Sequence, residues 1–91
     1  MSVLIRFAPP SMSAQQYNEA VRRLDEVGDW PPDGLDYHVC FGTDDNLHVS
    51  EIWDSQEQLN AFGERLMPVL SELGIEPGEP QLLEIHSIVK R

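Results

Sequence analysis

The segment spanning residues 37–62, YHVCFGTDDNLHVSEIWDSQEQLNAF, constrains the fold more than any other part of this chain. Two runs that alternate apolar and polar residues, 35–41 and 47–53, are separated by the acidic turn TDDN at 43–46. Asp and Asn tolerate the left-handed conformations that tight turns require, so the two runs predict an antiparallel hairpin. Ser55 followed by Gln58 then predicts a capped helix directly after the second strand of the hairpin.

The residues on either side of this segment supply a strand and a helix before it and a strand after it. Residues 3–7 form a short apolar run that two prolines stop, which predicts a first strand. Apolar residues recur at helical spacing over 17–27, behind a second capping box at 13–16. The helix that begins at Ser55 is expected to end at Gly74, and LLEIHSIV at 82–89 predicts the last strand.

The resulting order, βαββαβ, is that of the ferredoxin-like α+β fold, with a four-stranded antiparallel sheet and both helices on one face. A chain of 91 residues makes one domain of this kind, spanning 1–91. The outer strands carry apolar residues on both faces, as in residues 3–5 and 88–89, which indicates burial on two sides. Because two helices cover only one face, we expect the sheet of a second copy to cover the other, giving a homodimer.

The net charge limits the partners that this chain is expected to have. Sixteen acidic residues against six basic ones give a charge of −10, which repels nucleic-acid phosphates and anionic lipid heads. The run 47–52 also lacks the basic residues and the stacking aromatic pair of RNA-recognition motifs, which share this topology. The amino-terminal residues do not form a signal-peptide pattern, and no apolar run reaches the length of a membrane span. We therefore expect a cytoplasmic protein that binds neither nucleic acid nor membrane.

The junction between the third strand and the second helix is the one motif-like part of the chain. It reads Glu51-x-Trp53-Asp54-Ser55 and leads into a helix that carries Phe62. Together with the length and the order of elements, this junction resembles the dimeric α+β barrel proteins, and most closely the antibiotic-biosynthesis-monooxygenase-like small proteins. The resemblance implies a homodimer whose two sheets face each other around a central cavity that takes a small-molecule ligand. Some members of that group oxidise polycyclic aromatic compounds without a cofactor, others degrade haem, and many have no known activity.

The haem-degrading members have a pattern that this chain does not match. Their pattern places an Asn on the first strand and a Trp and a His on the second helix. The first strand here offers Arg6 and Phe7, the helical aromatic is Phe62, and no histidine occurs between Ser55 and Leu73. Haem degradation is therefore not expected, and no cofactor is predicted.

The hairpin register sorts the side chains of its two strands onto two faces. Closure over 43–46 places His38 opposite Glu51. Every second residue of the first strand, counted from His38, then shares one face with every second residue of the second strand, counted from Leu47. The other face is bulkier and more apolar, so we assign it to the helices and the face of His38 to the dimer cavity. The face assigned to the helices holds Tyr37, Val39, Phe41, His48, Ser50 and Ile52. The same sorting of the outer strands completes the predicted cavity, whose polar groups among apolar walls are typical of a binding site. Its candidate residues are His38, Glu51, Arg6, Cys40, Trp53, Glu84 and His86.

Within this set, His38 and Glu51 are the candidate catalytic residues. A carboxylate beside an imidazole orients the ring and supports its charged form, which suits proton abstraction from an acidic phenol or enol. The alternative is a cross-strand polar pair that satisfies itself and has no further role. Trp53 is either a surface on which a planar ligand stacks or an ordinary core residue. Trp30, in the Pro-rich loop 29–34, is either a lid or an interface anchor.

A metal site is not expected, because His48 falls on the face opposite His38 and no two histidines have ligand spacing on one element. Cys40 is the only cysteine, and a small buried thiol is its simplest interpretation. The best interpretation of the chain is a small-molecule-binding dimeric α+β barrel protein. Its specific form would be a cofactor-independent monooxygenase or isomerase acting on an aromatic or enolic substrate. The alternative is a non-catalytic dimeric module that binds a ligand or a protein partner.

Overall fold

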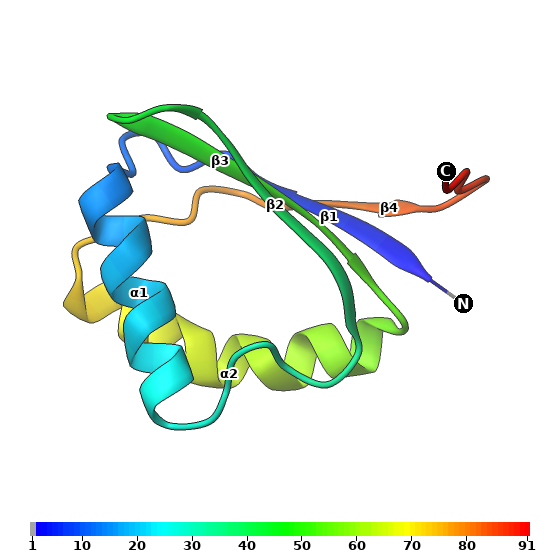
Figure 1. Cartoon of the computed structure of the whole chain (residues 1–91), viewed down its shortest axis with the longest axis horizontal. Helices are drawn as coiled ribbons and strands as arrows, with labels where there is room; N and C mark the ends of the chain where they lie inside the picture. The colour runs from blue at the N-terminus through cyan, green and yellow to red at the C-terminus, as the bar shows by residue number, and fades with distance from the viewer. Residues whose placement is uncertain (1) are drawn as a thin grey trace.

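The computed structural model describes residues 2–91, which form one four-stranded antiparallel sheet with two helices on one of its faces (Figure 1). Met1, the first residue of the predicted domain, lies outside the described residues. The strands lie in the order β2-β3-β1-β4, and all three pairings are antiparallel. The predicted ferredoxin-like α+β architecture is confirmed. Its elements are β1 (Val3–Phe7), α1 (Ala14–Glu26), β2 (Leu35–Thr43), β3 (Asn46–Trp53), α2 (Gln56–Glu72) and β4 (Gln81–Glu84).

Both helices begin at the predicted capping serines. The Ser13 hydroxyl accepts from the Gln16 backbone N–H at 3.1 Å, and the Gln16 side chain accepts from the Ser13 backbone N–H at 2.9 Å. Ser55 caps α2 by accepting from the Gln58 backbone N–H at 3.2 Å. These bonds satisfy amide groups that a helix start otherwise leaves without partners, so the capping residues fix where each helix leaves the sheet.

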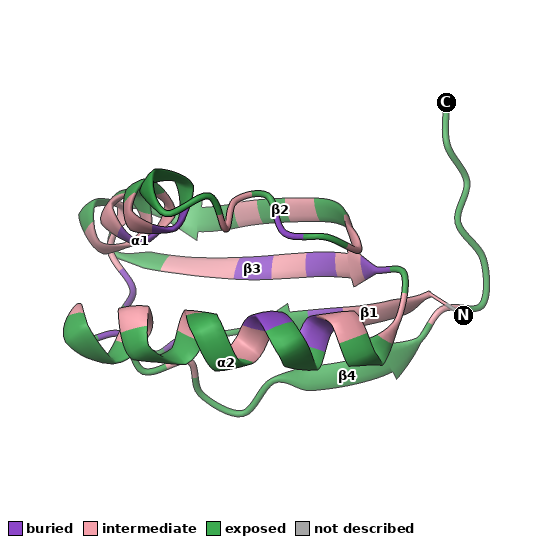
Figure 2. Ribbon diagram, turned by 90° about the horizontal axis from the view of Figure 1, so that it is seen from below, coloured by how far each residue is buried: buried purple, intermediate pink, exposed green. Residues whose placement is uncertain are grey.

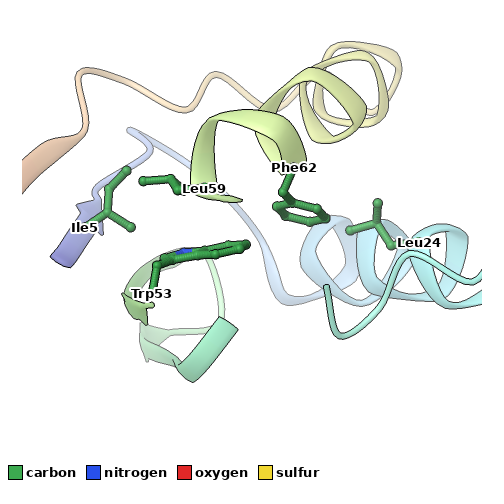
Figure 3. Packing of buried hydrophobic residues seen from close by; sticks show 5 residues of the cluster. All are labelled: Ile5, Leu24, Trp53, Leu59 and Phe62. Carbon is green, nitrogen blue, oxygen red and sulfur yellow. The ribbon is translucent and has the colours of Figure 1, made fainter. Parts of the chain in front are cut away.

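The core lies between the sheet and the two helices, where Figure 2 shows buried positions on β3 and on the inner sides of the helices. Trp53 is 0% exposed and Phe62 is 2% exposed, and their ring centroids are 5.6 Å apart. Figure 3 shows how the side chains of this cluster converge from two strands and both helices; the cluster is Ile5, Leu24, Trp53, Leu59 and Phe62. A second cluster extends the core toward the other end of the helices and contains Met12, Ala20, Val49 and Ile75.

The hairpin has the predicted register, but its faces are assigned wrongly in the sequence analysis. His38 pairs with Glu51 as expected. On the neighbouring strand, Ile5 pairs with Glu51 and Val3 with Trp53, and Ile5 and Trp53 both belong to the core under the helices. The face that carries His38, Glu51 and Trp53 is therefore the helix-covered face. The more apolar face is the open one, where Tyr37, Val39 and Phe41 are 43%, 49% and 39% exposed.

The last strand is shorter than predicted, because β4 ends at Glu84 and does not reach Val89. Glu84 pairs with Val3, the first residue of β1, so the chain beyond Glu84 runs past the strand that β4 pairs with. Residues 85–91 run past the end of the sheet (Figure 2), and Lys90 lies 3.9 Å from the Asp36 carboxylate and 5.3 Å from the centroid of the Tyr37 ring, both on β2. Among the described residues, neither helix combines the length and the apolar character needed to cross a membrane.

Candidate functional site

A continuous chain of side-chain hydrogen bonds crosses from α1 to the centre of the sheet. The Tyr17 hydroxyl lies 2.7 Å from Nε2 of His38, and Nδ1 of His38 lies 2.6 Å from Oε2 of Glu51. The indole Nε1–H of Trp53 donates to Oε1 of Glu51 at 3.0 Å. Four polar groups from one helix and two strands are thus joined in a single row.

Each member of this row is placed by regular secondary structure. His38 and Glu51 are directly opposite on β2 and β3, where paired side chains on one face lie within contact distance. Glu51 and Trp53 are two residues apart on β3 and share a face. Tyr17 lies on the inner side of α1 with Ala20 and Leu24, and its ring stacks on the His38 ring with centroids 5.8 Å apart.

Glu51 sets the direction of the hydrogen bonds. It is 5% exposed and is the one buried charged residue among residues 2–91. A buried carboxylate needs hydrogen-bond donors, and Trp53 can only donate. Because a carboxylate only accepts, the tautomer assigned from these partners places the proton on Nδ1 of His38. Nε2 of His38 is then an acceptor, and the Tyr17 O–H donates to it.

Tyr17 remains protonated over the physiological pH range. Burial, followed by the nearby Cys40 and Glu51, raises the pKa of Tyr17 from 10.0 to about 12. A phenol held in this form is a donor toward His38 and a weaker acid than an ordinary phenol. Burial also raises the pKa of the Cys40 thiol, which leaves it less reactive than a free cysteine.

A cavity of about 70 Å³ adjoins the row, between the sheet and the two helices. Its lining includes Tyr17, His38, Glu51 and Trp30, and the remaining walls are apolar side chains of both helices, the sheet and the loops at residues 9–12 and 75–77. The edge of the Trp30 ring meets His38, with centroids 4.8 Å apart. The cavity admits several water-sized groups, but it is about half the volume of the roughly 150 Å³ cavity known to hold benzene.

The structure brings some of the predicted site residues together and separates the others. His38, Glu51 and Trp53 are in direct contact, and Cys40 shares their face and packs against the second core cluster. Three predicted residues do not join them. Arg6 is exposed and pairs with Ser50 on the open face; Glu84, on the far edge strand, and His86, beyond that strand, are also exposed. Trp53 is a core residue with a polar contact, which corrects its placement as a cavity wall.

Tyr17 and Trp30 are the site residues that sequence reasoning missed as neighbours of His38. Tyr17 begins the run of helically spaced apolar residues at 17–27, and a buried tyrosine hydroxyl requires a polar partner. That requirement is the one signal in the sequence that indicates a polar group on β2 or β3. Within the described part of the chain, no three His, Cys, Asp or Glu side chains are placed to hold a metal ion.

The fold of this chain is that of the antibiotic-biosynthesis-monooxygenase-like small proteins, which confirms the predicted resemblance at the level of fold. Its sequence matches no protein-family profile and no curated protein.

Three solved structures illustrate the likeness. SnoaB, a cofactor-independent oxygenase from Streptomyces nogalater, is 12% identical with a TM-score of 0.63, over 99% of this chain and 96% of SnoaB. MupZ from Pseudomonas fluorescens is 8% identical with a TM-score of 0.67, over 99% of this chain and 94% of MupZ. A Deinococcus radiodurans protein classed as an antibiotic biosynthesis monooxygenase is 12% identical with a TM-score of 0.62, over 100% and 98% of the two chains.

Proposed function

We propose that this protein binds a weakly acidic phenol or enol in the cavity beside Tyr17, and that His38 removes the proton from the ligand's hydroxyl group. The observation that carries this proposal is the directed row of hydrogen bonds, in which Glu51 holds Nδ1–H at 2.6 Å and leaves Nε2 as an acceptor. An imidazole oriented by a carboxylate, with its acceptor nitrogen beside a cavity, is the usual arrangement of a general base.

Tyr17 occupies the ligand's place on His38 in the free protein. Its hydroxyl is 2.7 Å from Nε2, and its raised pKa of about 12 makes it a weak acid. A ligand hydroxyl that is more acidic is a stronger hydrogen-bond donor and displaces it. The site therefore selects for phenols and enols that are more acidic than Tyr17.

The chemistry that follows proton removal needs no group beyond the ligand and dioxygen. Transfer of the proton to Nε2 leaves an electron-rich enolate or phenolate, and Glu51 stabilises the imidazolium that forms. Dioxygen adds at the nucleophilic CH carbon of the enolate, which is the CH₂ carbon of the keto tautomer, and the new C–O bond uses the electron pair of the enolate. The resulting peroxide anion then takes the proton back from the imidazolium. Loss of water then leaves a carbonyl group, so that CH₂ and O₂ give C=O and H₂O. Return of the proton to carbon, without dioxygen, would instead isomerise the ligand.

The likeness of the fold to SnoaB supports the oxygenase form of this proposal. A second candidate function, a non-catalytic dimer in which the pair only joins two strands, is favoured by the small volume of about 70 Å³ of the cavity.

The test uses 4-nitrophenol, whose phenolate absorbs at longer wavelength than the neutral phenol. At a pH where most of the free probe is protonated, the wild-type protein should bind it and produce phenolate absorbance. His38→Gln keeps hydrogen-bonding capacity at similar size and should lose this absorbance, and any turnover should fall by about 100-fold or more. His48→Gln, on the open face, is the matched control and should behave as wild type. If His38→Gln still forms phenolate, His38 is not the base, and the pair of His38 and Glu51 has only a structural role.

We further propose that the protein is a homodimer whose open sheet faces pack on each other. The support is the apolar character of that face, where Val39 and Leu83 are each 49% exposed. Light scattering should give twice the chain mass for the wild type and a monomer for Val39→Lys with Leu83→Lys, because paired lysines in a closed apolar interface would be desolvated. Val27→Lys with Met67→Lys changes the residue directly after α1 and a residue of α2, which are 72% and 48% exposed, and this variant should remain dimeric. A monomeric wild type would refute the dimer.

A further inference from the structure

Trp30 lines the cavity from a loop and contacts His38. This residue lies between α1 and β2, in the segment that joins the helix to the edge strand. Its indole is half-buried, meets the His38 ring edge-on at 4.8 Å and lies 6.4 Å from the Phe62 ring, both measured between centroids. Trp30 thus covers the imidazole that the proposed function makes the base.

The volume behind this wall does not admit an aromatic ring. The cavity of about 70 Å³ is about half of the roughly 150 Å³ that accommodates a benzene molecule. Most of the other walls belong to helices and strands, whose backbones are fixed by regular hydrogen bonds and whose side chains form the two core clusters. A ring that reaches His38 must therefore displace a wall, and Trp30 is the wall beside His38 that is carried by a loop instead of a helix or a strand.

The loop that carries Trp30 is attached at its two ends, and within it Pro32 is buried and its carbonyl accepts from the Leu35 N–H at 3.2 Å. At the start, the Asp29 N–H donates to the Leu24 carbonyl at 2.8 Å; at the end, the Gly34 carbonyl accepts from the Asp54 N–H at 2.8 Å. Both flanking glycines have positive φ angles, +81° at Gly28 and +90° at Gly34. Such residues rotate with less steric resistance than others, so they are suitable pivots for residues 29–33.

One ion pair holds the start of this loop against α2. The Arg65 guanidinium lies 3.1 Å from the Asp29 carboxylate, and the two side chains are 47% and 30% exposed. An ion pair with this exposure is weak and sensitive to salt. It can favour the closed position of the loop without locking it.

We propose that Trp30 is the size-determining wall of the site and that residues 29–33 swing outward to let an aromatic ring reach His38. This inference rests on the proposed function for the role of His38, but it concerns a different property, the rate at which rings of different size gain access. The expected ligands are planar hydroxylated aromatics, with fused rings requiring a larger displacement of the loop than single rings.

The experiment measures association rates by stopped-flow absorbance with a matched pair of probes, 4-nitrophenol with one ring and 4-nitro-1-naphthol with two. In the wild type, the two-ring probe should associate about tenfold more slowly or more. Trp30→Ala should remove that difference. Arg65→Gln removes this partly exposed ion pair and the contact of the guanidinium with the Phe62 ring, 5.7 Å from its centroid, and should accelerate both probes by about two- to fivefold. Arg22→Gln breaks the exposed pairs with Glu19 and Glu26 on α1 and should change neither rate.

Three results would overturn or separate the two proposals. A wild-type ratio of rates that persists in Trp30→Ala refutes the role of Trp30, whatever His38 does. If the wild type binds neither probe, Trp30→Ala must bind the one-ring probe, and its failure to do so refutes the size-determining wall. Trp30→Ala with His38→Gln then tests the proposed function alone. If that double variant binds the probe as tightly as Trp30→Ala does and forms as much phenolate, the role of Trp30 is supported and the role of His38 as a base is refuted.

Discussion

Replacing Glu51 with Gln tests whether the row of hydrogen bonds has a direction. The carboxylate accepts from Trp53 at 3.0 Å and lies 2.6 Å from Nδ1 of His38. A glutamine of the same shape can still accept from the indole, but its NH₂ group then points at His38 and must donate. Nδ1 becomes the acceptor, and the proton moves to Nε2. The hydrogen-bonded contacts are kept, but Nε2 of His38 now carries a proton and cannot accept the proton of the ligand.

The cost to folding should be modest. A hydrogen bond to a charged group contributes about 1.5–3 kcal/mol and a neutral one about 0.5–1.5 kcal/mol, so weakening two bonds costs about 2 kcal/mol. Removing a charge from a site that is 5% exposed recovers part of its desolvation penalty. We expect Glu51→Gln to lower the free energy of unfolding by about 1–2 kcal/mol. Glu51→Ala leaves His38 and Trp53 without their partner and opens a void, and should cost about 3–5 kcal/mol.

Urea unfolding gives the two stability changes, and 4-nitrophenol absorbance gives the proton transfer. The expected pattern is a folded Glu51→Gln protein that forms no phenolate, because its imidazole has the wrong tautomer. Phenolate formation at the wild-type level in this variant would refute the directed row. A cost below about 1 kcal/mol for Glu51→Ala would refute the claim that the carboxylate satisfies two buried donors.

Two further predictions concern Tyr17 and the loop glycine. The folded state holds the Tyr17 proton more tightly than the unfolded state, because its pKa is raised from 10.0 to about 12. Stability should therefore fall as pH rises from about 10 to 12, by about 1–2 kcal/mol after allowance for partial exposure, and urea titrations of Tyr17→Phe should lack this loss. Gly34→Ala should lower the melting temperature, at a cost of at least about 1 kcal/mol, because φ is +90° and the new Cβ would lie 2.5 Å from the Gln58 side chain. Gly63→Ala is the control: that Cβ meets nothing within 4 Å, and inside a helix it should stabilise by about 0.5–1 kcal/mol.

The topology and the hairpin register follow from local features of the sequence. Ser13 and Ser55 cap the helices where the sequence predicts, and the turn at 43–46 fixes which residues of β2 and β3 are opposite. These features act over a few residues, so the sequence states them directly. The contact between His38 and Glu51 could be predicted for the same reason, because it depends only on the register of one hairpin.

The face on which that pair lies could not be predicted by comparing hydrophobicity. That comparison assumes that one face of the sheet is apolar and buried and that the other is polar and solvent-exposed. Here the open face is also apolar, since it holds Tyr37, Val39 and Phe41. The pairing of β1 with β3 settles the question, since Ile5 lies opposite Glu51 in the core. This pairing joins residues far apart in the sequence, and no turn between them specifies it. Arg6 is separated from the pair because it lies on the open face, Glu84 because it lies on the far edge strand, and His86 because it lies beyond the end of β4.

The position of the polar row argues that it serves more than the joining of β2 and β3. Apolar side chains of similar volume often hold a core together as well as buried ionic groups or better, so stability alone does not account for Glu51. A pair that only closed two strands would also need no third partner on a helix. Here Tyr17 extends the row to the cavity wall at 2.7 Å from Nε2, and Trp30 covers the imidazole at the same place. The Tyr17 hydroxyl thus donates to Nε2 of His38, and the Trp30 ring covers the imidazole. A hydroxylated aromatic ligand would bring the same two groups, a hydroxyl and an aromatic ring, to this site.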